Sequence, residues 1–212
     1  MVVGPGLRER KKQQTRQLIF DAAQRLFARR GFDRVTVAEI AREADVSEVT
    51  VFNYFPTKED LFFGGLEAFE EQLVEAVRNR PRGESALKAF RRRVLEGGEN
   101  LGDADRAATI RRAGSSIGPS AALRARERDV VETYTRRLAE VLAAETRSDP
   151  DDVEPTVAAL AMMSAHRALV AHVREQVAAG KRGRALADDF KTQARRAFAR
   201  IERGLGGYAV RP

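Results

Sequence analysis

The stretch TVAEIAREADVSEVTVFNYFPTK, residues 36–58, decides the fold of this chain. Thr36 and Glu39 have the T-x-x-E spacing of a capping box, in which the hydroxyl and the carboxylate each satisfy a free backbone N–H. Apolar residues then recur at helical spacing, and Ser47 is a good N-cap for a second helix that must end before Pro56. Two short helices joined by a tight turn form a helix-turn-helix, the motif with which many proteins bind DNA.

A long helix is predicted on each side of this motif. The first spans about residues 12–30 and stops at Gly31, and the second runs from Lys58 to about Arg78. Residues 1–10 are predicted to be a mobile arm whose basic side chains either follow DNA phosphates or are simply solvated. Gly64-Gly65 interrupts the second long helix, where it either packs closely on the first helix or acts as a hinge.

Composition narrows the class of protein. The chain has 212 residues, 38 Lys and Arg against 31 Asp and Glu, and a net charge of +7, which suits a polyanionic partner. It has no cysteine, which excludes disulfide frameworks, thiol nucleophiles and thiolate metal sites. The N-terminus has no apolar secretion signal, and the apolar run at 157–173 is interrupted by charge and short for a bilayer. These features predict a soluble, cytoplasmic protein without a membrane partner.

An enzymatic function is not expected. His166 and His172 are the two histidines, and six residues on one helix place them about 240° apart, so they cannot bind one metal ion together. The sequence contains neither a Gly-rich phosphate loop after a strand nor a nucleophile elbow. We therefore expect no catalytic residue, no metal site and no cofactor.

Residues 22–61 resemble the N-terminal domain of TetR-family transcriptional regulators. The matching patterns are A-x-x-L-F-x-x-x-G-F, T-V-x-x-I-A, A-x-V-S-x-x-T and Y-F-P-T-K-E-x-L, and together they cover about a fifth of the chain. The resemblance implies that the second helix of the motif enters the major groove of DNA. It implies DNA-binding roles for Thr36, Ser47, Glu48, Val49, Thr50, Phe52, Asn53, Tyr54 and Lys58.

The chemistry of these side chains suggests individual roles. Glu48 can accept a hydrogen bond from cytosine N4 or merely favour the helix dipole, and Val49 can contact a thymine methyl group. Thr50 can serve a base edge or a phosphate, and the resemblance implies phosphate contacts for Thr36, Tyr54 and Lys58. For Lys58 we prefer that role to a structural one, because a cation in a first helical turn is unfavourable.

Two positions depart from the family pattern, and two others are expected in the core. Phe52 stands where many relatives have Tyr, and Asn53 stands where an aromatic residue is common. Asn53 either reads adenine or is solvated, so the operator sequence does not follow by analogy. Val51 and Phe55 are predicted to be buried.

The rest of the chain is predicted to be helical, with its clearest break at residues 79–83. Helices are expected at about residues 84–96, 103–116, 118–145, 154–179 and 184–203. The sequence thus predicts an all-α fold of about nine helices. It divides the chain into a DNA-binding domain at 1–58, with the motif at about 36–55, and a helical ligand-binding and dimerisation domain at 59–212.

The last two long helices are predicted to form a homodimer. Leu186, Phe190, Ala194, Ala197, Ile201 and Leu205 follow one face of the last helix, and the helix before it is apolar on more than one face. The family resemblance also implies an interface of these two helices with their copies in the partner. A dimer would place two recognition helices in successive major grooves of a pseudo-palindromic operator.

A small-molecule effector is expected in the C-terminal domain, which faintly resembles that of family members with acyl-CoA-type ligands. Tyr134 and His166 could orient a ligand, and Arg112 and Arg167 could meet an anionic one, although salt bridges or solvent suit these arginines equally. The candidate liners, each of which could equally be ordinary core, are Phe90, Ile110, Ile117, Val131, Tyr134, Leu138, Met162, Met163 and His166.

The sequence therefore predicts a ligand-responsive transcriptional regulator, a repressor that binds double-stranded operator DNA as a dimer and is released from it by a small-molecule effector. An activator, or an architectural DNA-binding protein without a ligand, is the alternative. The effector and the target genes cannot be inferred from the residues.

Overall fold

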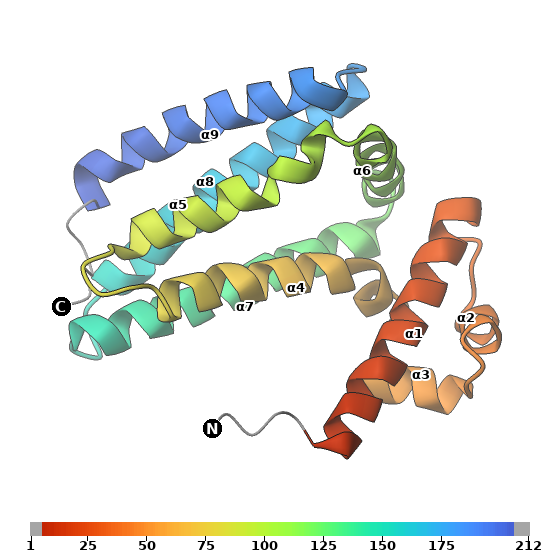
Figure 1. Cartoon of the computed structure of the whole chain (residues 1–212). Helices are drawn as coiled ribbons and strands as arrows, with labels where there is room; N and C mark the ends of the chain where they lie inside the picture. Colours follow the sequence, from red (N-terminus) through yellow and green to blue (C-terminus); the bar gives the residue numbers. More distant parts are fainter. Residues whose placement is uncertain (1–5, 206–212) are drawn as a thin grey trace. The chain divides into compact units, whose positions relative to one another are not determined.

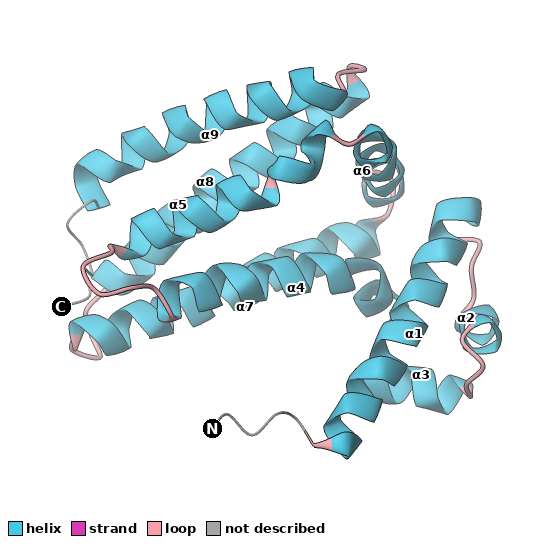
Figure 2. Ribbon diagram, viewed as in Figure 1, coloured by secondary structure: helices cyan, strands magenta, loops and turns pink. Residues whose placement is uncertain are grey.

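The computed structural model describes residues 6–205, which form helices joined by short turns (Figures 1 and 2). The all-α prediction is confirmed. The elements are α1 (Leu7–Arg30), α2 (Val37–Glu43), α3 (Glu48–Tyr54), α4 (Lys58–Arg78), α5 (Ala86–Gly97), η1 (Glu99–Gly102), α6 (Ala104–Ile117), α7 (Ala121–Thr146), α8 (Glu154–Ala178) and α9 (Gly183–Leu205).

Two compact units divide the chain. The first unit comprises Met1–Leu66 and Ser116–Arg126, and the second comprises Glu67–Ser115 and Glu127–Pro212. This division differs from the predicted domains 1–58 and 59–212. Apolar side chains explain the difference, because Leu61 and Phe63 of α4 are buried in the core of the first unit, together with Leu123 of α7.

The first unit is built around one apolar core. Ile19 of α1, Ile40 of α2 and Val51 of α3 are completely buried in it, and Phe55 is almost so. The predictions that Val51 and Phe55 belong to the core are confirmed. Phe27, Phe32, Phe62 and Phe63 form a chain of ring contacts, with centroids 5.1–5.9 Å apart.

The start of α1 differs from the prediction. The helix begins at Leu7 rather than near residue 12, so part of the expected arm is helical, and residues 1–5 lie outside the described residues. Leu18 of this helix is 54% exposed.

The glycine pair in α4 packs closely on α1. A Cβ atom at Gly64 would lie 2.8 Å from Cε2 of Phe20, whereas one at Gly65 would lie 3.7 Å from the same ring. The first distance is shorter than a normal van der Waals contact. The structure therefore explains Gly64 by close packing, the first of the two predicted alternatives.

In the second unit, α8 and α9 lie side by side and α5 packs against both (Figure 1). The helix α8 is long and apolar enough, by length and composition, to cross a membrane, which corrects the prediction that this run is too short. Many of its side chains nevertheless form the core of the unit, among them Ala158, Met162, Leu169, Val173 and Val177. This burial is typical of a central core helix.

The apolar stripe of α9 packs inside its own unit. Leu186, Phe190 and Ala194 are buried, and Ile201 packs against the same core. Large exposed apolar side chains occur instead on α8, where Val157 is 55% and Leu160 is 51% exposed. The stripe on which the dimer prediction rested is thus covered within the chain, and the outer face of α8 remains available.

Candidate nucleic-acid interface

Two capping arrangements set the ends of the helices in the helix-turn-helix. The backbone N–H of Glu39 donates to Oγ1 of Thr36 (3.2 Å), and the N–H of Thr36 donates to Oε2 of Glu39 (2.9 Å), so the predicted capping box is present. Asp45 adopts a left-handed conformation with φ of 54° in the turn, which a short polar side chain tolerates. Ser47 then accepts a hydrogen bond from the N–H of Thr50 (3.1 Å) and starts α3.

One face of α3 projects into solvent. Glu48, Val49, Phe52 and Asn53 are exposed, while Val51 on the opposite side is completely buried. Val49 is 70% and Phe52 is 46% exposed, so two of the four are apolar side chains open to solvent. The fold thus brings four of the predicted DNA-contacting residues together on one surface.

The remaining predicted residues of α3 lie at the edge of this face. Oγ1 of Thr50 lies 2.8 Å from Oγ of Ser47, so these hydroxyls contact each other as well as the helix cap. Tyr54 is partly buried against the core of the first unit. Among the described residues its hydroxyl has no hydrogen-bond partner, which leaves the phenol able to donate to a phosphate.

Lys58 has an intramolecular role that the sequence did not indicate. Its ammonium donates to the backbone carbonyls of Phe32 and Val35, each at 3.1 Å, and lies 4.1 Å from the centre of the Phe32 ring. The cation therefore stabilises the loop between α1 and α2. These contacts give Lys58 a structural role at the start of α4, and the phosphate contact that we preferred from the sequence stays a prediction.

An ion pair extends the capping box of α2. Nη1 of Arg30 donates to Oε1 of Glu39 at 2.7 Å. The N–H of Thr36, with Arg30 as a further cause, lowers the pKa of Glu39 to about 2. The carboxylate of Glu39 therefore stays ionised, and both of its oxygens accept hydrogen bonds. It holds the side chain of Thr36 at the N-terminus of α2.

The first turns of α1 add positive charge to this unit. Arg8, Arg10, Lys11 and Lys12 are all exposed on the helix. Among the described residues these four side chains form no ion pair or hydrogen bond. These basic side chains therefore project from a helix rather than from the predicted mobile arm.

The predicted ligand-binding residues are divided between the two units. Phe90, Leu138, Met162, Met163 and His166 are buried in the core of the second unit with Val131, and Ile110 and Tyr134 pack against it. Ile117 lies in the core of the first unit, which corrects its grouping with the others. An apolar period along a helix identifies a buried face but not the core to which that face belongs.

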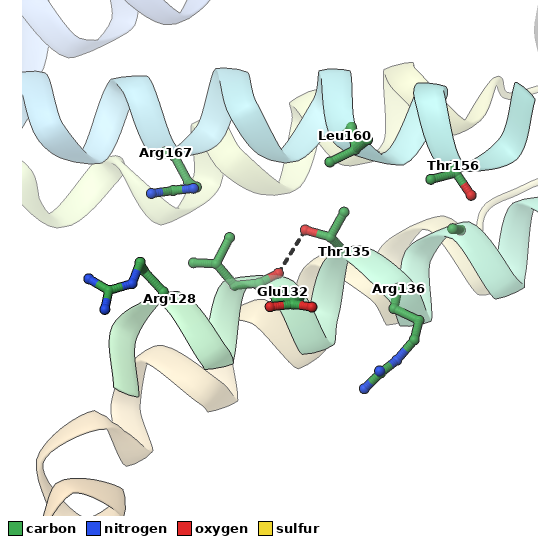
Figure 3. A pocket seen from close by; sticks show the side chains of 9 residues that line it. Arg128, Glu132, Thr135, Arg136, Thr156, Leu160 and Arg167 are labelled. Atoms are coloured by element: carbon green, nitrogen blue, oxygen red, sulfur yellow. Dashed lines mark hydrogen bonds between the residues drawn. The ribbon is translucent and has the colours of Figure 1, made fainter. Parts of the chain in front are cut away.

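A cleft of about 450 Å³ lies between α7 and α8 in the second unit (Figure 3). Val131 is the one predicted ligand-binding residue in its lining, and Arg167, which we expected to meet an anion, lies there as well. The sequence reasoning missed the cleft residues Arg128, Glu132, Thr135, Arg136, Ala139, Thr156 and Leu160. The spacing of Arg128, Glu132 and Arg136 at four-residue steps was the available signal.

Comparison with known proteins gives matches to both parts of the chain. The family of bacterial regulatory proteins, tetR family, matches residues 19–64, and the MftR C-terminal domain matches residues 84–205. TcmR, an HTH-type transcriptional regulator of Streptomyces glaucescens, is 37% identical over 87 residues, which are 41% of this chain and 38% of TcmR. The regulator LuxR of Vibrio harveyi is 54% identical over 46 residues, 22% of each chain. These relatives are thus matched over less than half of their length.

Solved structures share the fold over most of the chain. The SmeT–triclosan complex has a TM-score of 0.57 at 16% identity and covers 88% of this chain and 91% of its own. FadR from Bacillus subtilis in complex with stearoyl-CoA has a TM-score of 0.53 at 18% identity and covers 86% of this chain and 97% of its own. With the exposed face of α3 and the match over residues 84–205, these findings show that the chain belongs to the tetR family of DNA-binding transcriptional regulators.

Proposed function

We propose that this regulator is a repressor that binds a pseudo-palindromic operator as a dimer and leaves it when a small molecule binds the second unit. The observation that carries the DNA-binding part is the solvent-exposed face of α3, with Val49 70% and Phe52 46% exposed. Val49 and Phe52 are suited to thymine methyl groups, whereas Glu48 and Asn53 are suited to cytosine N4 and adenine. Thr50, Tyr54 and Thr36 would contact phosphates at the margin.

We propose the outer face of α8 as the centre of the dimer interface. Val157 is exposed there, and Ser164, Ala168 and Ala171 continue the face with small side chains that allow close helix packing. A homodimer carries two copies of α3, as two half-sites about one turn of DNA apart require. Membership of the family supports a cytoplasmic location.

The mechanism we propose is a population shift. A ligand releases the operator only if it binds more tightly to a conformation in which the two α3 helices are misplaced. Helices α6 and α7 can transmit the change, because Ser116–Arg126 belongs to the first unit while the rest of both helices belongs to the second. Arg126 donates to Asp60 at 2.7 Å, and Asp60 also accepts from the N–H of Thr57 at the start of α4.

Selection from a random double-stranded DNA library tests the operator proposal. We expect the full-length protein to enrich a two-fold symmetric sequence over competitor DNA at a stated salt concentration. Failure to enrich any sequence contradicts operator binding and favours the architectural alternative. The direction of regulation is read from a reporter that carries the selected sequence upstream, where repression is expected and activation contradicts it.

Substitutions on α3 test the proposed contacts. Val49→Ala and Phe52→Ala should each weaken binding to the selected duplex by about 1–3 kcal/mol while leaving non-specific binding unchanged. Leu18→Ala on α1 is the matched control, because Leu18 is 54% exposed in the same unit but lies on another helix. An equal loss in the control contradicts a specific role for α3.

A further inference from the structure

Three arginines line the cleft between α7 and α8. Arg128 and Arg136 come from α7 and Arg167 from α8, and Figure 3 shows Arg128 and Arg167 at the same end of the cleft on opposite helices. Glu132 is the acidic side chain in the lining. The side chains that line the cleft therefore carry a net charge of +2.

Several arginines of the same unit form ion pairs, whereas the three in the cleft do not. Arg80 pairs with Glu145 at 2.5 Å, Arg174 with Glu127 at 2.5 Å, and Arg137 with Glu71 at 2.8 Å. Among the described residues, Arg128, Arg136 and Arg167 form no ion pair or hydrogen bond. Glu132 lies four residues from both Arg128 and Arg136 on α7, yet it pairs with neither.

The chemistry of the cleft defines the ligand it fits. A planar guanidinium binds carboxylate or phosphate oxygens through two parallel hydrogen bonds, and two such groups lie at the same end of the cleft on opposite helices. Beside them the wall is aliphatic, with Val131, Ala139 and the half-exposed Leu160. The volume of about 450 Å³ is that of a small-molecule site rather than a macromolecular one.

We propose that the α7–α8 cleft binds a small organic anion, a carboxylate or phosphate on an aliphatic body, through Arg128 and Arg167. The charged group lies between these two guanidiniums and the aliphatic part lies along Leu160 and Ala139. This proposal rests on the proposed function, because it makes the anion the effector. It names a site on the α7 side of α8, which shares Val131 with the sequence-predicted liners but lies apart from the buried core that holds most of them.

The position of the cleft along α7 explains how its occupation would reach DNA. Arg128 follows Arg126 by two residues on the same helix, and Arg126 belongs to the first unit through its bond to Asp60. A helix transmits displacement along its axis because its backbone hydrogen bonds are continuous. An anion that draws α7 towards α8 therefore acts on a helix whose first turns belong to the DNA-binding unit.

Calorimetric titration of the full-length protein with octanoate and with octyl phosphate tests the site, with 1-octanol and inorganic phosphate as comparisons. We expect saturable binding of the two amphiphilic anions, and weaker or no binding of 1-octanol and phosphate. The double variant Arg128→Gln/Arg167→Gln should lose about tenfold or more in affinity for the anions. Absence of saturable anion binding to the unsubstituted protein at millimolar concentration overturns the proposal.

The matched control is Arg195→Gln/Arg196→Gln on α9, which removes the same charge from two exposed arginines. Equal losses in both double variants would show that net charge rather than the cleft governs binding, which overturns the site. Sedimentation is measured on all three proteins. A cleft variant that no longer dimerises, while the control does, would assign the cleft to the contact with a second copy and also overturn the proposal.

DNA binding distinguishes failure of this inference from failure of the proposed function. With the selected duplex, the anion should lower the affinity of the unsubstituted protein and of the control but not that of the cleft variant. Anion binding without any change in DNA affinity would retain the site but contradict its effector role. A protein that selects no operator contradicts the proposed function, whatever the titration shows.

Discussion

Nε2 of His166 on α8 lies 3.2 Å from Oε1 of Glu70 on α4, with the two side chains 7% and 1% exposed. The contact is close but lacks hydrogen-bond geometry, and Oε2 of Glu70 and both ring nitrogens of His166 have no hydrogen-bond partner among the described residues. The ring of Phe69 lies 5.4 Å from that of His166. A buried polar pair is therefore enclosed by apolar and aromatic side chains, where loss of either partner is costly.

We expect His166→Leu to destabilise the second unit by about 3–5 kcal/mol, because it leaves the carboxylate of Glu70 buried beside an apolar group. The double variant Glu70→Leu/His166→Leu should recover most of that loss, since no polar atom of the pair remains. Urea unfolding at fixed pH measures both free energies of unfolding. Glu140→Ala on the exposed side of α7 is the control and should stay within about 0.5 kcal/mol. A double variant as unstable as the single one would refute the pairing.

Replacement of glycine by alanine should stabilise the fold where the added Cβ atom has free space and destabilise it where the Cβ atom would clash. A Cβ at Gly98 would lie 2.0 Å from Cε1 of Phe190, and one at Gly64 would lie 2.8 Å from Phe20, whereas Gly114 within α6 has nothing within 4 Å. We expect Gly114→Ala to stabilise by about 0.5–1 kcal/mol through helix propensity. Gly98→Ala should lower the free energy of unfolding by about 1–3 kcal/mol. For Gly64→Ala, the cost of displacing the Phe20 ring should cancel the gain in helix propensity. Thermal unfolding ranks the three, and stabilisation by Gly98→Ala would contradict this packing.

Substitution of Lys58 should lower the stability of the first unit, whatever it does to the affinity for DNA. Lys58→Met removes both hydrogen bonds to the carbonyls of Phe32 and Val35 and the contact with the Phe32 ring. We expect a loss of about 1–3 kcal/mol in the free energy of unfolding of the first unit. Arg42→Gln is the control, because Arg42 is exposed in the same unit and has no partner among the described residues. A variant that keeps full stability but loses DNA affinity would restore the phosphate role predicted from the sequence.

Acid should weaken the capping box of α2. The pKa of Glu39 is lowered from 4.5 to about 2 in the folded chain, first by the N–H of Thr36 and then by Arg30. A carboxyl whose folded pKa lies below its unfolded value stabilises the fold at pH above the unfolded value and loses that contribution as pH falls towards the folded one. The contribution of Glu39 should therefore be complete above about pH 4.5 and decline down to about pH 2.

Carboxyl chemical shifts recorded against pH measure this titration directly. Arg30→Gln should raise the pKa of Glu39 only part of the way, because the backbone N–H of Thr36 remains as the larger cause. Arg29→Gln, one residue away in the same last turn of α1 and paired with Glu43 instead, should leave it unchanged. A midpoint near 4.5 in the unsubstituted protein would show that the box is not formed in solution.

Local chemistry in the sequence determined the helix-turn-helix. Thr36, Glu39 and Ser47 satisfy backbone donors within three residues of themselves, and an apolar period needs no distant partner to mark a buried face. For that reason the caps, the burial of Val51 and the exposed face of α3 could all be predicted. The assignment of nearly every other helix followed from the same period, to within a few residues at each end.

Only the tertiary structure decided what lies next to what. An apolar stripe predicts that a helix face is buried but not the core in which it is buried. The sequence therefore did not show that Ile117 belongs to the core of the first unit, or that the stripe of α9 is buried within its own unit. A charge in the sequence does not state its partner, so the carbonyls that bind Lys58 and the unpaired arginines of the α7–α8 cleft appeared only in three dimensions. Contacts between residues far apart in the chain depend on how whole helices pack, which single-residue preferences do not encode.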